Sequence, residues 1–212
     1  NTEYGMRVFS AVADASGTSQ NTFSGNHCYE NGTTGKTEFY IFNPSNKIIN
    51  NIFSSNIITL DGVNSTIGMA VQGDENTFTD NHITNSNNDQ TGTAYQLFNC
   101  ENTNIVGGVV KGVAVAFGFS GSVGVIPNGI TIDGVTALEV ASFIPSISSF
   151  GVGGIGHDII NNRATHGGAG TDIGIVISAA TDGQYTLKGN KLDGFDKGIT
   201  ISDVAIYVSD NT

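Results

Sequence analysis

The sequence predicts an all-β fold, a right-handed parallel β-helix in which about seven to eight short coils stack into a solenoid. Three observations support this prediction. The composition favours strands and turns, one six-residue pattern recurs along nearly the whole chain, and a second apolar segment accompanies the copies. We expect residues 1–212 to form a single domain, and to be a fragment of a longer chain, because a strand-like segment begins already at Tyr4 without an initiator Met.

The composition excludes several other classes of protein. The 29 glycines and 23 asparagines disfavour helix interiors, and leucine occurs only five times while β-branched residues are common. With 38% hydrophobic and 13% charged residues, the chain is too apolar for a disordered protein and too uncharged for a coiled coil. A fold built from short strands and tight turns remains.

The charge and the missing motifs limit the partners. The 19 carboxylates outnumber 8 basic side chains, so a nucleic acid would be repelled. No run of about 18 apolar residues exists, so we expect no membrane insertion. We find no phosphate-binding loop, nucleophile elbow or zinc motif, and therefore expect no cofactor. A neutral or partly cationic partner, or an acidic glycan held through cations, stays compatible with this charge.

The recurring pattern is an apolar residue, two residues, then Asn, Asp or Gly, one residue, and a second apolar residue. Two such short strands every 25–30 residues cannot bury a core alone, but stacked copies can, with backbones about 4.8 Å apart. An antiparallel sandwich would not explain a polar residue at one fixed offset. The seven copies begin at Phe23, Ile48, Phe78, Ile105, Ile130, Ile159 and Leu187.

Asparagine suits such a stack, because its amide can both donate and accept a hydrogen bond between coils and its backbone tolerates sharp corners. We interpret one set of residues as a structural ladder: Asn26, Asn51, Asn81, Asp133, Asn162 and Asn190. A second ladder is predicted two residues before each copy, at Asn21, Asn46, Asn76 and Asn128, with Thr103, His157 and Tyr185 as departures.

The stretches that begin at Asn21, Asn46 and Asn76, such as Asn-Thr-Phe-Ser-Gly-Asn and Asn-Thr-Phe-Thr-Asp-Asn, resemble the repeat of the pectin-lyase-like parallel β-helix superfamily. The richness in Asn, Thr, Ser and Gly is most similar to the β-helix domain of a bacteriophage tailspike. The resemblance covers nearly the whole chain. It implies the fold, whereas the function stays open, since the superfamily includes lyases, hydrolases, epimerases and inert shafts.

Carboxylates are the first candidates for catalysis, because the resemblance implies that a glycan would be cleaved by Asp and Glu on the coil surface. Asp74 and Glu101 each lie four residues before the first apolar position of consecutive copies, so the repeat predicts that they stack one coil apart. Glu75 and Asp80 lie close by. Solvated turn charges are the competing interpretation. A pair about 5–5.5 Å apart would suit a retaining glycosidase.

Aromatic and metal-ligating residues supply further candidates. Tyr29, Tyr40 and Tyr95 could stack on pyranose rings. The segment Gly153–Asn161 matches a calcium-binding nonapeptide once, and a half-match follows at 167–172, which makes Asp158 and Asp172 weak metal candidates. Because calcium sites of this kind need tandem copies, we interpret the glycines as connections and expect no metal.

Two further predictions concern packing. Cys28 and Cys100 should both be free thiols, because about three coils separate them and a disulfide needs Cα atoms within about 7 Å. The apolar loops expected at 118–129 and 144–156 need a cover. A fold-back onto the helix and contact with a neighbouring subunit are both open, and the tailspike resemblance implies a homotrimer.

Together these observations predict a domain that recognises a cell-surface polysaccharide, located on a virion tail or otherwise extracellular. Whether it also cleaves the glycan, as a glycoside hydrolase or polysaccharide lyase, stays open. The alternatives are a non-catalytic shaft or stalk segment, and a lyase or epimerase of the same superfamily.

Overall fold

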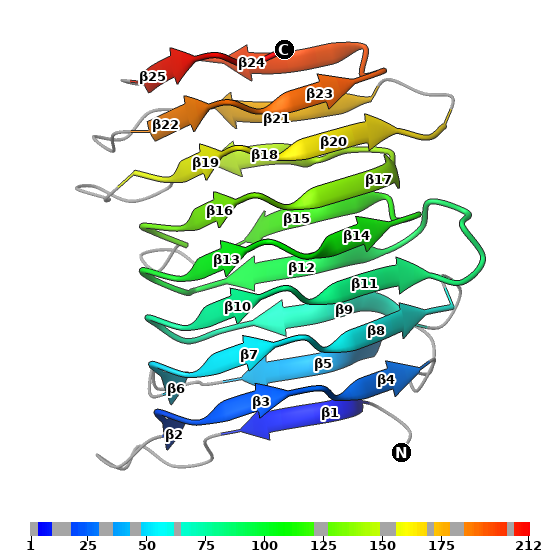
Figure 1. Cartoon of the computed structure of the whole chain (residues 1–212), viewed down its shortest axis with the longest axis vertical. Helices are drawn as coiled ribbons and strands as arrows, with labels where there is room; N and C mark the ends of the chain where they lie inside the picture. The colour runs from blue at the N-terminus through cyan, green and yellow to red at the C-terminus, as the bar shows by residue number, and fades with distance from the viewer. Residues whose placement is uncertain are drawn as a thin grey trace.

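The computed structural model describes residues 4–9, 18–29, 36–42, 48–61, 65–120, 127–148, 156–168, 172–178, 185–202 and 206–212. Within these residues every regular element is a β-strand, and every strand pair is parallel. Figure 1 shows the strands stacked as rungs, from β1 at one end to β25 at the other. The predicted parallel β-solenoid is confirmed.

Two sheets form the face nearest the viewer in Figure 1. The eight-stranded sheet contains β3 (Thr22–Ser24), β7 (Ile52–Ser54), β10 (Thr77–Thr79), β13 (Asn104–Val106), β16 (Thr131–Asp133), β19 (Asp158–Ile160), β22 (Tyr185–Lys188) and β25 (Ile206–Ser209). The seven-stranded sheet contains β4 (His27–Tyr29), β8 (Ile57–Leu60), β11 (His82–Asn85), β14 (Val109–Lys111), β17 (Thr136–Val140), β20 (Arg163–His166) and β23 (Lys191–Asp193).

The strands behind them close each coil. A five-stranded sheet contains β1 (Tyr4–Phe9), β5 (Lys36–Phe42), β9 (Ser65–Val71), β12 (Thr93–Phe98) and β15 (Val115–Ser120). A three-stranded sheet contains β18 (Ile144–Ser148), β21 (Ile173–Ser178) and β24 (Lys197–Ile201). A bridge from Val115 to Ser142 leads from the first of these sheets towards the second. A short sheet pairs β2 (Thr18–Ser19) with β6 (Ile48–Ile49).

The core lies inside the coils and is built by stacking like upon like. The rings of Phe23, Phe53 and Phe78 stack in register, with Phe53 and Phe78 centroids 4.8 Å apart and their planes at 9°. Tyr95 and Phe117 stack in the same way in the sheet behind, at 5.2 Å. Because side chains alternate along a strand, the neighbours of these residues point outward. One apolar side chain per strand is thus enough to extend the core by one coil.

At both ends of the strands of the eight-stranded sheet, the chain turns at a residue with positive φ, which is usually followed by Asn. We call the turn before the strand the first corner and the turn after it the second corner. At the second corner, eight successive coils carry a residue with positive φ, from Gly25 at 67° to Asp210 at 55°. Asp, Asn and Gly tolerate this conformation better than other residues. The residues that follow it form the ladder of the second corner: Asn26, Asn56, Asn81, Gly108, Val135, Asn162, Asn190 and Asn211.

The asparagine amides of this ladder form hydrogen bonds from one coil to the next. Asn81 Oδ1 accepts hydrogen bonds from the backbone N–H of Asn56 at 3.0 Å and from its Nδ2 at 2.9 Å. Asn81 Nδ2 donates to the Phe53 carbonyl at 2.9 Å. Asn162 and Asn190 repeat the arrangement. Since these amides are buried, leaving one unpaired would cost roughly 1–3 kcal/mol, which explains why the residue type recurs.

The first corner carries the other ladder, which begins with Asn21, Asn51 and Asn76. His157 takes the Asn position in a later coil, and its Nδ1 accepts the Ile130 N–H at 3.1 Å, as an Asn oxygen would. Its ring lies between Phe119 and Tyr185, each 5.4 Å away. Burial lowers the pKa of His157 to about 4, so the ring is neutral at pH 7.

Two copies of the sequence pattern were predicted in the wrong register. Phe23 pairs with Phe53 rather than Ile48, and Ile105 pairs with Ile132 rather than Ile130. At Ile48 the reason is that Asn follows both corners, five residues apart, so the pattern matched the first corner instead of the second. At Ile130 the second corner, Gly134, is followed by Val135, and the pattern matched Asp133 before that corner. Asn51 therefore belongs to the ladder of the first corner, whereas Asn46 lies outside the described residues and Asn128 lies in neither ladder.

Asp133 was also misplaced as a ladder residue. It lies in an outer row of the eight-stranded sheet, between Val106 and Ile160, and accepts a hydrogen bond from Asn161 Nδ2 at 3.1 Å. The buried position that follows the corner in this coil is Val135, whose N–H donates to Asn162 Oδ1 at 2.9 Å. An apolar residue thus replaces the amide where the next coil supplies the acceptor.

Two packing predictions have definite outcomes. Cys28 and Cys100 are free thiols, as predicted, and both are buried. Burial raises the pKa of Cys28 to about 11. The segment expected as an apolar loop from residue 144 begins as strand β18, with Ile144 and Ile147 buried in the core. The loops at 121–126 and 149–155 lie outside the described residues. Among the described residues, no helix has the length and apolar character needed to span a bilayer.

Candidate functional site on the outer face

The outward side chains of the seven-stranded sheet form two straight rows along the solenoid. We define row 1 as His27, Ile57, His82, Val109, Thr136, Arg163 and Lys191, which are register partners from coil to coil. Row 2 begins with Tyr29, Thr59, Thr84 and Lys111, also in register. Successive members are about 4.8 Å apart along the axis, the spacing of paired strands. The rows therefore present equally spaced polar groups to one elongated ligand.

Tyr29 is the aromatic group of this surface. Its side chain is 57% exposed, and the His27 ring lies 6.3 Å away, edge to face. Tyr40 is half-buried in β5, on the far side of the coil, where the Arg7 guanidinium lies 5.9 Å from its ring centre. The sugar-stacking prediction does not hold for Tyr95. That ring is buried in the core, stacked on Phe117, because its strand turns this position inward.

The predicted carboxylates Asp74 and Glu101 do lie in adjacent coils at the first corner. Asp74 Oδ1 accepts the Glu101 backbone N–H at 2.9 Å, and Glu75 N–H donates to the Glu101 carbonyl at 2.8 Å. Burial of the half-exposed Asp74 raises its pKa, and the negative charges of Glu101 and Glu75 raise it further. The corner thus joins one carboxyl with increased proton affinity to two exposed carboxylates, a combination that suits acid catalysis.

The two other carboxylate candidates are corner residues with positive φ, at 55° for Glu75 and 51° for Asp80. Asp80 lies at the opposite end of β10 from Asp74, at the second corner. Its carboxylate packs against the next coil so closely that a Cβ on Gly107 would lie 2.2 Å from Asp80 Oδ1. The structure therefore brings Asp74, Glu75 and Glu101 together and leaves Asp80 apart from them.

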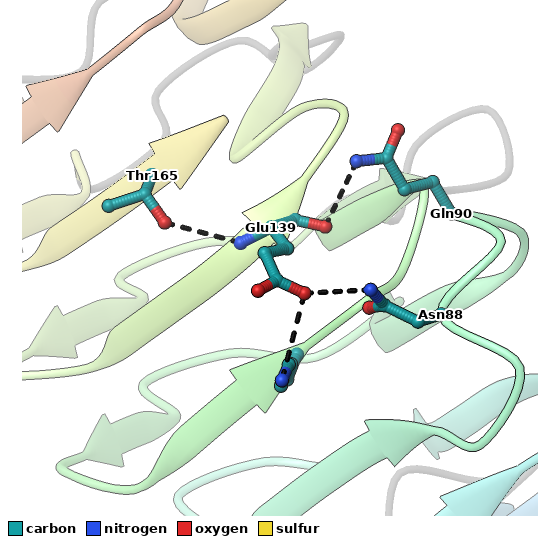
Figure 2. A network of polar contacts seen from close by, with 5 residues as sticks. Asn88, Gln90, Glu139 and Thr165 are labelled. Carbon is teal, nitrogen blue, oxygen red and sulfur yellow. Dashed lines mark hydrogen bonds and ion pairs between the residues drawn. The ribbon is translucent and has the colours of Figure 1, made fainter. Parts of the chain in front are cut away.

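A polar network that the sequence did not predict lies where strands β11, β14, β17 and β20 of the seven-stranded sheet end (Figure 2). Glu139 Oε2 accepts a hydrogen bond from Asn88 Nδ2 at 2.8 Å and lies 3.7 Å from Lys111 Nζ. Its backbone carbonyl accepts from Gln90 Nε2 at 3.2 Å, and its N–H donates to Thr165 Oγ1 at 3.2 Å. Glu139 thereby fixes the β11–β12 connection beside row 2.

The backbone is unusual at this network. Glu139 has a φ of +55°, and the pairing of β17 with β20 shifts register between Ala137 and Val140. A Cβ on Gly167 would lie 2.5 Å from Glu139 Cα, so only glycine allows this close crossing. Such bulges redirect side chains at sheet edges. Here the bulge turns the carboxylate of Glu139 towards Lys111.

The weak metal candidates are not brought together. Asp158 is exposed at the start of β19, whereas Asp172 is buried with its Oδ2 2.6 Å from His166 Nε2. Among the described residues, no group of three or more His, Cys, Asp or Glu side chains could hold a metal ion. Residues 153–155 of the nonapeptide lie outside those residues.

Comparison of the chain with protein-family models, curated proteins and solved structures finds no match. The site is therefore interpreted from its own geometry. The sequence indicated Asp74 and Glu101 through their shared offset in the repeat, and Tyr29 as one of three aromatic residues that could stack on a sugar. It did not indicate the network of Glu139. The one available signal was a single Glu in the otherwise nearly uncharged segment from 112 to 156.

Proposed function

We propose that this chain is the polysaccharide-recognising β-helix domain of a phage tailspike or similar extracellular adhesin. The glycan lies along rows 1 and 2 of the seven-stranded sheet. The observation that supports this proposal most directly is the exposed Tyr29 at the start of a row continued by Thr59, Thr84 and Lys111. A polysaccharide is a linear repeat of hydroxyl-bearing rings, and such a row offers it equally spaced donors and acceptors.

Recognition in this arrangement combines stacking with hydrogen bonding. A pyranose ring packs on the exposed face of Tyr29, which buries apolar area without a large entropic cost. The side chain of Ile57, which lies in row 1 and is 46% exposed, adds apolar surface beside Tyr29 for the sugar to pack on. Thr59 and Thr84 then donate to and accept from the hydroxyls of the following rings. Few of these interactions are individually strong, so affinity accumulates along the track.

Cleavage of the glycan is a second candidate function, favoured by the corner of Asp74 and Glu101. The two carboxylates lie in adjacent coils, and the pKa of Asp74 is raised. In a hydrolase, the protonated Asp74 would donate to the leaving oxygen while Glu101 acts as nucleophile or base. A non-catalytic shaft is the competing function, favoured by the hydrogen bond that ties Asp74 to the Glu101 backbone.

The test is binding of the chain to purified capsular and lipopolysaccharide glycans, measured by calorimetry and followed by an assay for new reducing ends. Tyr29→Ala should weaken binding about tenfold, which corresponds to the ~1.4 kcal/mol of one lost stacking contact. Tyr207→Ala is the matched control, since Tyr207 is 60% exposed but lies on the outer face of the eight-stranded sheet. Equal effects of the two variants, or no binding to any glycan, would contradict the proposal.

We also propose that the domain acts as a homotrimer on a virion tail or another extracellular surface. The tailspike resemblance supports this. Ile52, which is 46% exposed on the outer face of the eight-stranded sheet, lies apart from rows 1 and 2 and is available for a contact between subunits. Sedimentation equilibrium distinguishes the states, since a monomer has a mass of 22.0 kDa. A single species at that mass at all concentrations would contradict the proposed homotrimer.

A further inference from the structure

Row 1 carries basic side chains and no acidic ones. Its titratable members are His27, His82, Arg163 and Lys191. The outer rows of the neighbouring eight-stranded sheet carry both signs of charge, with Asp133 and Asp158 beside Lys188. In a chain with 19 carboxylates and only 8 basic side chains, a row of this kind offers an anion a local environment unlike the rest of the surface.

Arg163 and Lys191 form the strongest part of this row. They are register partners in β20 and β23, and both are exposed. Paired strands hold their backbones about 4.8 Å apart, so two like charges lie side by side on one face. Such a pair is unfavourable unless an anion or a carboxylate compensates it.

Neither member of this pair forms an ion pair within the part of the chain that the structure describes. Lys111 has an ion-pair partner, Glu139 at 3.7 Å, whereas neither Arg163 nor Lys191 has one within 4.0 Å among the described residues. Asp193 lies on the same outer face, two residues after Lys191, and lowers the local charge without closing an ion pair. The two cations are therefore available to an external anion.

We infer that Arg163 and Lys191 bind an anionic substituent of the polysaccharide, a carboxylate of an acidic sugar. This inference rests on the proposed function. The guanidinium fork of Arg163 accepts a carboxylate in bidentate geometry, and the Lys191 ammonium neutralises it from the next coil. Thr136, the partner of Arg163 one coil back, offers a hydroxyl to the same sugar. The acidic sugar thus binds near the C-terminal coils, and neutral rings extend towards Tyr29.

The experiment uses two carboxylated polymers, hyaluronate and alginate, each beside its methyl ester, which keeps the backbone and removes the charge. Affinities of the full chain are measured at low and high NaCl. Lys191→Gln should weaken binding of the acid form about tenfold, the loss expected for one charge-assisted contact. Lys197→Gln, the same change at an exposed lysine on β24, should weaken it less than twofold. Arg163→Lys should weaken it although the charge is kept.

The outcomes separate this inference from the proposed function. Equal binding of the acids and their esters, or equal effects of Lys191→Gln and Lys197→Gln, would overturn the anionic site. Glycan binding that still depends on Tyr29 would then leave the proposed function intact. A double-stranded oligonucleotide that binds as tightly as hyaluronate, with the same dependence on Lys191, would overturn the assignment to an acidic sugar. Binding of hyaluronate or alginate but not their esters, lost with Lys191→Gln and with salt, is the result we expect.

Discussion

The inner and outer sides of the same strands differ in what constrains them. Along β10 and β13, Phe78 and Ile105 are buried and meet their equivalents in the coils above and below. Their outward neighbours Thr79 and Val106 touch solvent and follow no single residue type. The inner side must repeat itself for the coils to stack, whereas the outer side is free to vary. Structure is therefore encoded inside the coil, and binding specificity can be encoded outside.

The largest expected difference comes from one charge placed on either side of β13. Ile105→Asp would bury an unpaired carboxylate where the side chain is 1% exposed, and should destabilise the chain by at least ~4 kcal/mol. Val106→Asp, at the adjacent position with 38% exposure, should cost less than about 1 kcal/mol, including the repulsion from its register partner Asp133. Denaturant unfolding followed by circular dichroism measures both. Similar losses in the two variants would erase the distinction between the sides.

Asparagines on the two sides should differ in the same sense. Asn81→Ala removes three buried hydrogen bonds and leaves the Phe53 carbonyl and the Asn56 amide groups unpaired, so we expect a loss of about 3–4 kcal/mol. Asn104→Ala, in an outer row of the eight-stranded sheet, should cost less than about 0.5 kcal/mol. Denaturant unfolding measures the stability of both variants. If Asn81→Ala is as stable as the parent chain, the ladder does not stabilise the fold.

His157, in the ladder of the first corner, should make the stability of the chain depend on pH. Its folded pKa, about 4, lies below the ordinary value of 6.5, so the unfolded chain binds the proton first as pH falls. Its contribution is complete above pH 6.5 and declines towards pH 4, by roughly 3 kcal/mol in total at 1.36 kcal/mol for each pKa unit. His157→Asn keeps an acceptor and removes the titration, and should flatten this part of the profile. An unchanged slope would contradict the assignment.

The sequence predicted the inner side of the coils better than the outer side. The core positions and most of the ladder residues could be read from the repeat, because stacking requires like residues at like places. The register failed at Ile48, because Asn follows both corners and one pattern cannot tell them apart. It failed at Ile130, because Val135 replaces the Asn that follows the second corner and the pattern matched Asp133 instead. Tyr95 was misjudged for a related reason: a single Tyr does not reveal which way its strand turns it. Glu139 was missed because its contacts depend on a bulge that has no sequence period.

The corner carboxylates should show the smallest effect on stability. In Asp74→Asn the amide oxygen can still accept the Glu101 N–H, and the partly buried charge is removed. Because the folded pKa of Asp74 is raised, its ionised form opposes folding at pH 7, so the variant should be unchanged or slightly more stable, by less than about 1 kcal/mol. Combined with Glu101→Gln, it should abolish any glycan cleavage while binding persists. Full cleavage by the double variant would exclude this pair as catalysts.

The most direct test of the stacked outer rows is a set of spin-label distances along row 1. Cysteines placed at His27 and Thr136 lie four coils apart in register, and those at His27 and Lys191 lie six coils apart. Both native cysteines are buried, so the new sites can be labelled selectively. With about 4.8 Å for each coil, pulsed electron paramagnetic resonance should give mean separations near ~19 and ~29 Å. Distances that do not grow in proportion to the number of coils would contradict the parallel stack and the binding track built on it.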